Sequence, residues 1–358
     1  MNDAIGGTSS SNENDNRQVL SVGKAPSLCS QCRALNLSAG DFFVPAGERK
    51  NTGERQNENL YEPITLDTRP WDSIKNATSC PLCQLLVSAI EMASEEWQAG
   101  QAPLHCQISK RLSDYPNNEN TRVLEFVAQY KWTASRGSLI PVQSDAYPGA
   151  FPGRRIKPGQ VDVDQIRRWL QQCETEHRGP CQQPSTGEFD KLKVDILVID
   201  VKARCLRRLG DCCRYFALSY VWGGVNQAEA KLDSLQRLLI PGALNDLGDA
   251  VPLTIRDAME FVEKLGERYL WVDALCIVQD DYTTKQSMIE QMHLIYSQAY
   301  ATLIAAWGAN SDAGLPGVSK SSRKVDQRTA SISDDLAFVY PLPFQAIKKA
   351  AWATRGWT

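Results

Sequence analysis

The sequence contains no run of about 18 apolar residues, so we expect no transmembrane helix. Its first 17 residues are polar and lack the apolar core of a secretory signal peptide. Basic residues do not outnumber acidic ones: 39 Lys and Arg against 42 Asp and Glu give a net charge of −3. This balance argues against a nucleic-acid or membrane partner. These absences predict a cytoplasmic protein, or else a nuclear one, whose thiols stay reduced.

Cysteine is abundant by contrast, with 11 residues. In a reducing compartment these are expected to be metal ligands, core residues or reactive thiols before disulfides. Two pairs with CxxC spacing, Cys29/Cys32 and Cys80/Cys83, supply the four thiolates of a tetrahedral structural zinc site. The alternative is two unrelated pairs, with Cys83 packed in the core. A zinc-dependent hydrolase is disfavoured, because four thiolates leave no coordination position open for water.

A weaker metal candidate lies further along the chain. Cys173 and His177 are four residues apart on one face of a helix predicted from about Asp164 to Glu176, and Cys181 follows. The alternative is a core cysteine with a hydrogen-bonded histidine. A catalytic Cys–His dyad is disfavoured, since the sequence offers no third group to orient the histidine.

The chain is predicted to have three parts. Residues 1–25 are polar and predict a disordered tail. Residues 26–190 predict a mixed α+β region that contains all of the candidate metal ligands. It has an amphipathic helix beginning near Cys80, a strand over 123–130 and a long connection over 133–160. Residues 191–358 form the third part, with a boundary near residue 190.

The third part alternates strands and helices. We expect strands over 216–222, 269–278 and 301–306, a helix from Pro252 to Gly266, and a further helix from Thr283 or Thr284. The almost continuously apolar run 269–278 is typical of a strand buried on both faces. This order predicts an α/β domain: a parallel sheet with right-handed crossovers between two helical layers.

Six segments of this part resemble, in the same order, the motifs of the fungal heterokaryon-incompatibility (HET) domain. They are residues 215–223, 252–258, 269–279, 292–300, 314–318 and 352–358. The motif positions expected to matter are Ser219, Tyr220, Trp222, Gly223, Trp271, Asp273, Cys276, Gln279, Tyr296, Arg355, Gly356 and Trp357. The resemblance implies a TIR-like or flavodoxin-like fold. It also implies a role in self/non-self recognition and cell death through protein partners or self-association.

Two departures from the family pattern bear on mechanism. Val278 stands where the family usually has Asp or Asn, and the sequence stops at Thr358, before the family's Gln-Glu. The alternative function is a TIR-like enzyme that cleaves NAD, and the missing glutamate would be its catalytic residue. On that alternative this chain is expected to be inactive. The stop within a motif also predicts a truncated chain that is less stable than full-length relatives.

Some motif residues allow two interpretations from sequence alone. Asp273, placed within a buried strand, must be paired. Its partner is either Ser219, Tyr220 or a backbone turn in a structural role, or a ligand at the strand's end. The glycine turn after Trp222 permits a nucleotide phosphate to approach the backbone closely. Alternatively, it is a simple turn that follows aromatic side chains covering the core. Arg355 either clamps an anion or forms an ion pair, and Cys276 is expected in the core.

Overall fold

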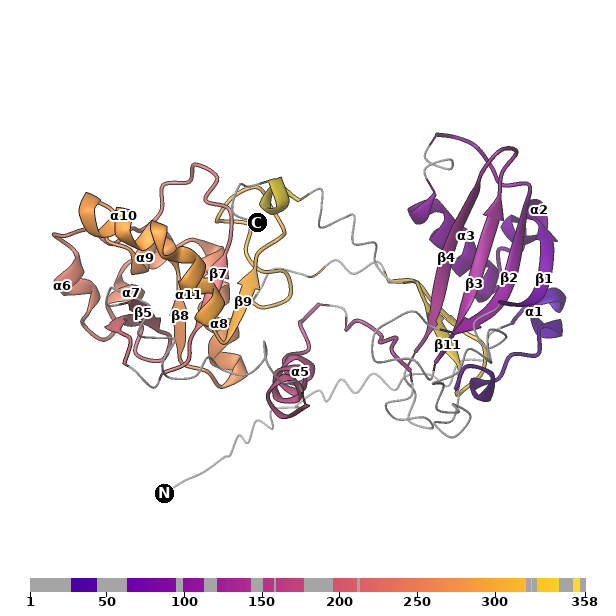
Figure 1. The fold of residues 1–358 in the computed structure, drawn as a ribbon, viewed down its shortest axis with the longest axis horizontal. Coiled ribbons are helices and arrows are strands. Elements are labelled where there is room, and N and C mark those ends of the chain that lie inside the picture. Colours follow the sequence, from indigo (N-terminus) through magenta and orange to yellow (C-terminus); the bar gives the residue numbers. More distant parts are fainter. Residues whose placement is uncertain are drawn as a thin grey trace, which may run out of the picture. The chain divides into compact units, whose positions relative to one another are not determined.

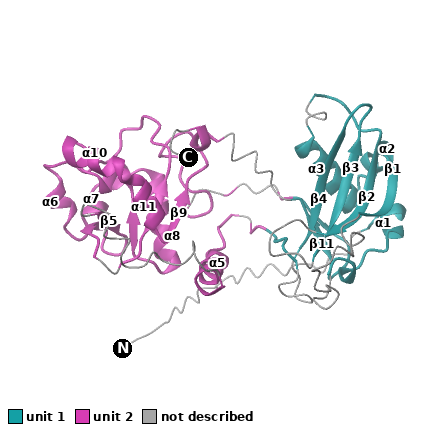
Figure 2. Ribbon diagram, viewed as in Figure 1, with its two compact units in different colours: residues 1–155, 328–341 teal, residues 156–327, 342–358 magenta. Residues whose placement is uncertain are grey.

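The computed structural model describes residues 27–43, 63–94, 99–112, 121–142, 151–157, 159–176, 196–210, 213–319, 323, 327–340 and 350–354. Contacts divide the chain into two compact units, coloured separately in Figure 2. Unit 1 contains residues 1–155 and 328–341, and unit 2 contains residues 156–327 and 342–358. The boundary predicted near residue 190 and the tail predicted over 1–25 lie outside the described residues. Among the described helices, none is long and apolar enough to cross a membrane.

Unit 1 is built on a six-stranded antiparallel sheet with the order β1-β2-β3-β4-β11-β10. The strands are β1 (Ile64–Pro70), β2 (His105–Leu112), β3 (Arg122–Gln129), β4 (Ala134–Pro141), β10 (Thr329–Ser331) and β11 (Ala337–Val339). The helices are α1 (Ser30–Ala34), η1 (Ala39–Asp41), α2 (Trp71–Lys75) and α3 (Pro81–Ala93). In Figure 1 the yellow β11 lies beside the purple β4, about 200 residues earlier in the chain.

The predicted strand over 123–130 and the helix beginning near Cys80 are confirmed by β3 and α3. The predicted connection over 133–160 is wrong at its start, because 134–141 form β4. Gly137 weakens the strand pattern there, but it lies opposite Phe126, and a Cβ at Gly137 would meet the Phe126 ring at 2.4 Å. The glycine therefore makes room for an aromatic side chain on the neighbouring strand.

Unit 2 contains a mixed five-stranded sheet with the order β6-β5-β8-β7-β9. Its strands are β5 (Leu197–Asp200), β6 (Cys205–Arg208), β7 (Phe216–Ser219), β8 (Tyr269–Trp271) and β9 (Ala301–Ile304). The predicted parallel arrangement is confirmed for β8, β7 and β9. The expectation of a wholly parallel sheet is wrong, because β5 runs antiparallel to both β6 and β8. A tight turn at 201–204 reverses the chain between β5 and β6, which makes that pair antiparallel.

The helices of unit 2 are α5 (Val163–Glu176), α6 (Leu235–Leu238), α7 (Ala243–Asp246), η5 (Gly248–Ala250), α8 (Leu253–Leu265), α9 (Asp273–Cys276), α10 (Tyr282–Glu290), α11 (Met292–Gln298) and η6 (Ala351–Thr354). Helix α8 confirms its prediction closely. Pro252 precedes it, Gly266 ends it with a φ of 89°, and its apolar stripe is buried against the sheet.

The strand predicted over 269–278 is corrected by the structure. β8 ends at Trp271, and Asp273 begins the short helix α9 at the carboxyl end of that strand. The Cys276 N–H donates to the Val272 carbonyl over 2.7 Å, which closes one helical turn. A buried apolar run fits a helix and a strand equally well, so periodicity cannot separate them.

Asp200 holds the turn between β5 and β6. Its buried carboxylate accepts the N–H groups of Lys202 at 3.2 Å and Ala203 at 3.0 Å. It also accepts two N–H bonds from Arg268, at 3.0 and 2.8 Å. Burial alone would raise the pKa of this carboxyl, but Arg268 and the backbone donors hold the pKa of Asp200 below its ordinary value.

We expect Asp200→Asn to lower the free energy of unfolding of unit 2 by about 2 kcal/mol at neutral pH, since hydrogen bonds to charged groups contribute roughly that much. The folded pKa is depressed, so the stabilisation is present above the unfolded pKa of about 3.9 and is lost as pH falls through the folded pKa. Urea unfolding between neutral pH and pH about 3 measures both effects. Asp249→Asn, at an exposed pair with Arg256, is the control. Equal losses in both variants would contradict the prediction.

Candidate functional site

The predicted motif residues gather at the carboxyl ends of two neighbouring parallel strands. Tyr220 and Trp222 follow β7, and Asp273 follows β8. The Trp222 Nε1–H donates to both carboxylate oxygens of Asp273 at 3.1 Å. Asp273 also accepts the Ala274 N–H at 2.8 Å. This is the edge at which parallel sheets bind ligands. The prediction that Asp273 lies within a buried strand is wrong, because β8 ends at Trp271 and Asp273 begins α9.

Tyr220 lies next to Asp273 and is 2% exposed. Burial raises the pKa of its hydroxyl, and the neighbouring Asp273 carboxylate raises that pKa further. The amide of Gln227 lies beside the same hydroxyl, and its polar atoms are buried. Sequence reasoning missed Gln227, because a glutamine in a loop carries no pattern that predicts burial.

Other motif residues support this edge from inside. Gln279 donates from its amide to the carbonyls of Asp273 at 2.9 Å and Ile277 at 3.0 Å, which ties down the α9 turn. The rings of Trp271 and Tyr296 meet edge to face with centroids 5.5 Å apart. Cys276 is buried as predicted, and burial raises its pKa to about 12. Gln279 thus holds the backbone at Asp273, the residue that accepts from Trp222.

The space beside the glycine turn after Trp222 is filled by another segment of the chain. Gly223 has a φ of 69°, and a Cβ there would meet Asn310 Cβ at 2.3 Å and the Ala309 carbonyl oxygen at 2.6 Å. The Ser311 N–H donates to the Trp222 carbonyl at 3.2 Å. The close approach that Gly223 permits is therefore an approach of residues 309–311.

Two further motifs meet at the start of α8. The Gly314 N–H donates to Thr254 Oγ1 at 3.0 Å, and the Leu315 N–H donates to Asp257 Oδ2 at 2.7 Å. Thr254 and Asp257 are each 1% exposed. Their polar side chains sit inside the predicted 252–258 motif, yet their partner lies about 60 residues away, so sequence reasoning did not single them out.

The final motif begins against β7. Trp352 Nε1–H donates to Ser219 Oγ at 2.8 Å, so Ser219 pairs with this motif. Arg355, Gly356 and Trp357 lie outside the described residues. Their predicted roles, and the NAD-cleaving alternative that depends on this end of the chain, stay predictions.

Unit 1 contains a second candidate site, the cysteine cluster formed by Cys29, Cys32, Cys80 and Cys83. Their Sγ atoms all lie within 4.8 Å of one another. Cys29 precedes α1 and Cys32 lies in it, while Cys80 precedes α3 and Cys83 lies in its first turn. Three of the thiols are buried and Cys29 is half-buried. The two CxxC pairs predicted to converge do so, across 47 intervening residues.

The spacing of the cysteine cluster fits a tetrahedral ion. Cys83 Sγ lies 3.5 Å from Cys32 Sγ and 3.9 Å from Cys29 Sγ. Zinc–sulfur bonds of about 2.3 Å put tetrahedral sulfur atoms about 3.8 Å apart. The Cys32 N–H donates to Cys29 Sγ at 3.4 Å, as the loop of a chelating pair does. The four residues could therefore hold a metal ion.

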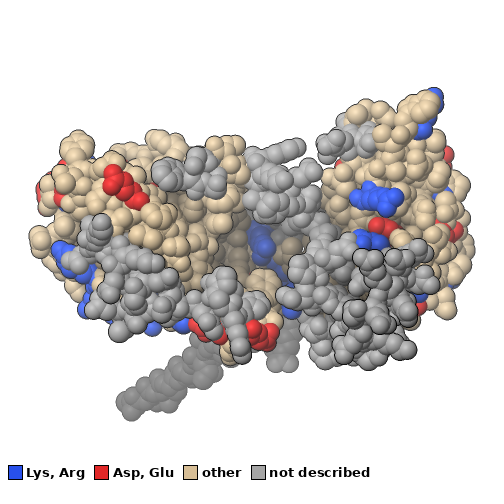
Figure 3. All heavy atoms as spheres, in the orientation of Figure 1, with Lys and Arg blue, Asp and Glu red and all other residues tan. Residues whose placement is uncertain are grey.

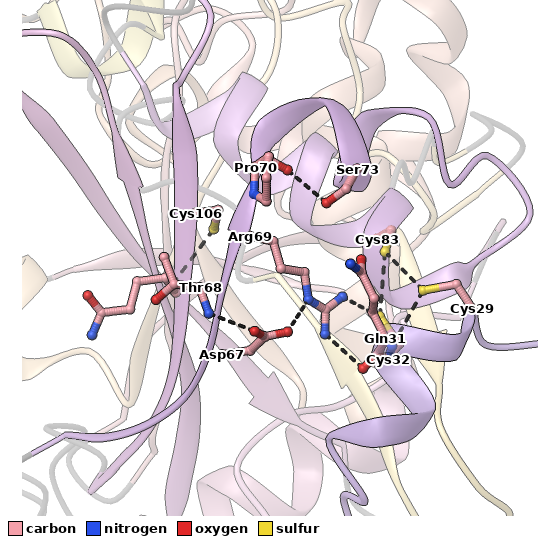
Figure 4. Close-up of polar contacts among 11 residues, drawn as sticks. Cys29, Gln31, Cys32, Asp67, Thr68, Arg69, Pro70, Ser73, Cys83 and Cys106 are labelled. Atoms are coloured by element: carbon pink, nitrogen blue, oxygen red, sulfur yellow. Dashed lines mark hydrogen bonds and ion pairs between the residues drawn. The ribbon is translucent and has the colours of Figure 1, made fainter.

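A buried arginine contacts the cysteine cluster. Arg69 Nη1–H donates to Cys32 Sγ at 3.1 Å (Figure 4). The hydrogen bond with Cys80 contributes most to raising the pKa of Cys32 to about 12, with Cys83 and Arg69 acting in the opposite direction. Burial lowers the pKa of Arg69, but its bonds to Cys32 and Asp67 raise it above its ordinary value. Metal binding would release protons from these thiols.

The weaker metal candidate is only partly described. Cys173 is half-buried on α5, while His177 and Cys181 lie outside the described residues. On α5, Trp169 is 49% exposed, whereas Ile166 and Leu170 pack against the unit 2 core. Arg167 fixes the helix by donating to the carbonyls of Lys264 and Leu265 at the end of α8.

Charged side chains are interspersed on the described surface. On the face in Figure 3, the blue Lys and Arg and the red Asp and Glu form small groups among larger uncharged areas. This mixed distribution accords with the net charge of −3.

Comparisons with known proteins agree with the motifs at the strand ends. Residues 215–358 match the family model "Heterokaryon incompatibility protein (HET)". The chain is 27% identical over 100 residues to "Heterokaryon incompatibility protein 6, OR allele" of Neurospora crassa. That match covers 25% of this chain and 14% of the relative. No solved structure matches the chain. The ordered motifs and the strand-end site lie in the segment that matches the family model, so residues 215–358 are similar to the HET domain.

Proposed function

We propose that this chain is an intracellular, cytoplasmic or nuclear module of self/non-self recognition that promotes cell death. It acts by associating with a protein partner or with a further copy of itself. The observation that carries the proposal is the convergence of HET motif residues at one sheet edge, where Trp222 donates to both oxygens of Asp273. The name of the Neurospora relative supports the incompatibility role.

We also propose that the parallel part of unit 2 is TIR-like or flavodoxin-like. The three parallel strands occur in the spatial order β8-β7-β9, which is second, first and third along the chain. That is the order with which flavodoxin-like sheets begin. The β5–β6 hairpin would then be an addition at the edge next to β8.

The functional proposal predicts that Asp273→Ala abolishes cell death. The variant leaves the Trp222 indole and the buried Tyr220 without their carboxylate, and each unsatisfied group costs about 1–3 kcal/mol. The full chain is expressed from an inducible promoter in a filamentous fungus, and dead cells are counted by uptake of a vital dye. We expect death with the wild-type chain and survival with Asp273→Ala.

The control for this experiment is Asp246→Ala, at an exposed position on α7 in the same unit. It should kill as the wild-type chain does. Survival of cells that accumulate folded wild-type chain would contradict the functional proposal. Equal killing by the wild-type chain and Asp273→Ala would show that the function does not depend on Asp273.

We further propose that the cysteine cluster binds a structural zinc ion in unit 1. The support is the set of four thiols at tetrahedral spacing, three of them buried. Zinc would supply a cross-link between the start of α3 and α1. Four thiolates close the coordination, so the role is structural.

A further inference from the structure

Arg69 is a buried charge whose neighbours are the cysteine cluster and one carboxylate. Its side chain is 1% exposed. Its Nε–H donates to Asp67 Oδ2 at 2.5 Å, and its Nη2–H donates to the Gln31 carbonyl at 3.0 Å. The third described bond is the one to Cys32 Sγ at 3.1 Å. Charged groups are buried almost only where they are paired. Asp67 supplies one negative charge, and a Cys32 thiolate would supply a second on the opposite side of the guanidinium.

The Arg69 side chain projects from strand β1 toward the cysteine cluster. Arg69 is the buried residue of a strand whose other side chains are exposed or half-buried. Asp67 lies two residues earlier, so it projects from the same face of the strand. It is 33% exposed. Figure 4 shows the guanidinium between Asp67 on one side and the Cys32 and Gln31 segment of α1 on the other.

We infer that Arg69 is a positioning residue of the zinc site. It orients the Cys32 thiolate by a charged N–H···S bond and offsets part of the charge of the site. The inference depends on the proposed zinc site. A zinc ion with four thiolates has a net charge of −2, and a buried net charge is destabilising unless it is compensated. The guanidinium contributes +1 directly beside the sulfur atoms. The −1 of Asp67 lies on the other side of the guanidinium and is 33% exposed, so solvent screens it more.

The planar fork of Arg69 matters as well as its charge. The guanidinium reaches a sulfur, a carbonyl and a carboxylate at once, with donors in fixed directions. A lysine at this position would keep the charge but could not make the three bonds in that geometry. Groups that hydrogen-bond metal ligands typically contribute about 10- to 100-fold to metal affinity.

The test measures zinc affinity and cobalt spectra of the full chain. Zinc affinity is measured by competition with a chromophoric chelator for the wild-type chain, Arg69→Met, Arg69→Lys and Asp67→Asn. We expect a loss of about 10- to 100-fold for Arg69→Met and a smaller loss for the other two. In the Co²⁺-substituted chain, loss of the N–H···S bond raises the sulfur lone pair in energy. The sulfur-to-cobalt charge-transfer band should therefore move to lower energy in Arg69→Met.

The matched control is Arg111→Met. Arg111 lies on β2 of the same sheet and pairs with Glu125 at 3.1 Å, in a described contact that involves none of the four cysteines. It should keep wild-type affinity and spectrum. If Arg69→Met does not fold, the cobalt spectra of Arg69→Lys and Asp67→Asn test the inference instead. A charge-transfer band at the wild-type energy in both variants would contradict it.

The two proposals fail in different ways. A wild-type chain that takes up no zinc overturns the zinc site and with it the role of Arg69. A wild-type chain that binds one zinc, with unchanged affinity and an unchanged cobalt band in Arg69→Met, overturns the role of Arg69 and leaves the zinc site standing.

Discussion

Cys83→Ala is expected to abolish stoichiometric zinc binding and to unfold unit 1 under conditions in which the wild-type unit is folded. Cys83 is fully buried, and its sulfur contacts those of both Cys29 and Cys32. It therefore connects α3 to both cysteines of α1. Structural zinc contributes on the order of 10 kcal/mol to folding, so the loss of one of four ligands should exceed any single packing defect in this unit.

Zinc content by mass spectrometry and hydrogen exchange of the α1 and α3 amides measure this effect. The control is Cys106→Ala, a cysteine buried in the same core but outside the cysteine cluster. It should keep one zinc and lose only about 1 kcal/mol, the amount expected for a small cavity. Chelation should destabilise the wild-type chain and leave Cys83→Ala unchanged. Equal destabilisation of both cysteine variants, with zinc retained in both, would contradict the prediction.

The parts of the fold that the sequence predicted have local signals. Helix α8 has a proline before its first residue, a glycine after its last and an apolar stripe between them. The parallel arrangement of β7, β8 and β9 followed from the alternation of strands and helices. The contact between Trp222 and Asp273 was not predicted, because Asp273 was placed inside a longer strand. The two-residue spacing within each CxxC pair is visible in the sequence itself, so the convergence of the pairs could be predicted before the fold was known.

The parts that the sequence did not predict depend on distant partners. Gly137 looks like a loop residue until Phe126 is found opposite it. Arg69 stands between Asp67 and Pro70 with nothing to mark it as buried, because its partners on α1 lie 37 and 38 residues earlier. Asp200 fixes the antiparallel hairpin through Arg268, 68 residues later.

The hairpin also places residues outside the family match in the same sheet as the HET motifs. The match begins at residue 215, whereas β5 and β6 end by residue 208. β5 pairs with β8, the strand that leads into Asp273. We infer that the structural unit that positions Asp273 is larger than the matched segment, because the edge of β8 is completed by upstream residues.

The second large effect is expected from Gly223→Ala, compared with Gly224→Ala. Both glycines have nearly the same left-handed conformation, with φ of 69° and 70°, so both variants incur about 1 kcal/mol of backbone strain. They differ in what a Cβ would touch. At Gly223 it would meet Asn310 Cβ at 2.3 Å, whereas at Gly224 nothing lies within 4 Å.

Gly223→Ala should therefore lose about 1–3 kcal/mol more than Gly224→Ala in urea unfolding of unit 2, the usual cost of overpacking. The clash involves the backbone around Asn310, so it cannot be relieved by rotating a side chain. Displacing residues 309–311 also removes the bond from the Ser311 N–H to the Trp222 carbonyl, which fixes the indole that donates to Asp273. We thus expect Gly223→Ala to abolish the proposed cell-death activity and Gly224→Ala to retain it. Equal stability and equal killing by the two variants would mean that the contact with residues 309–311 does not hold the strand-end site together.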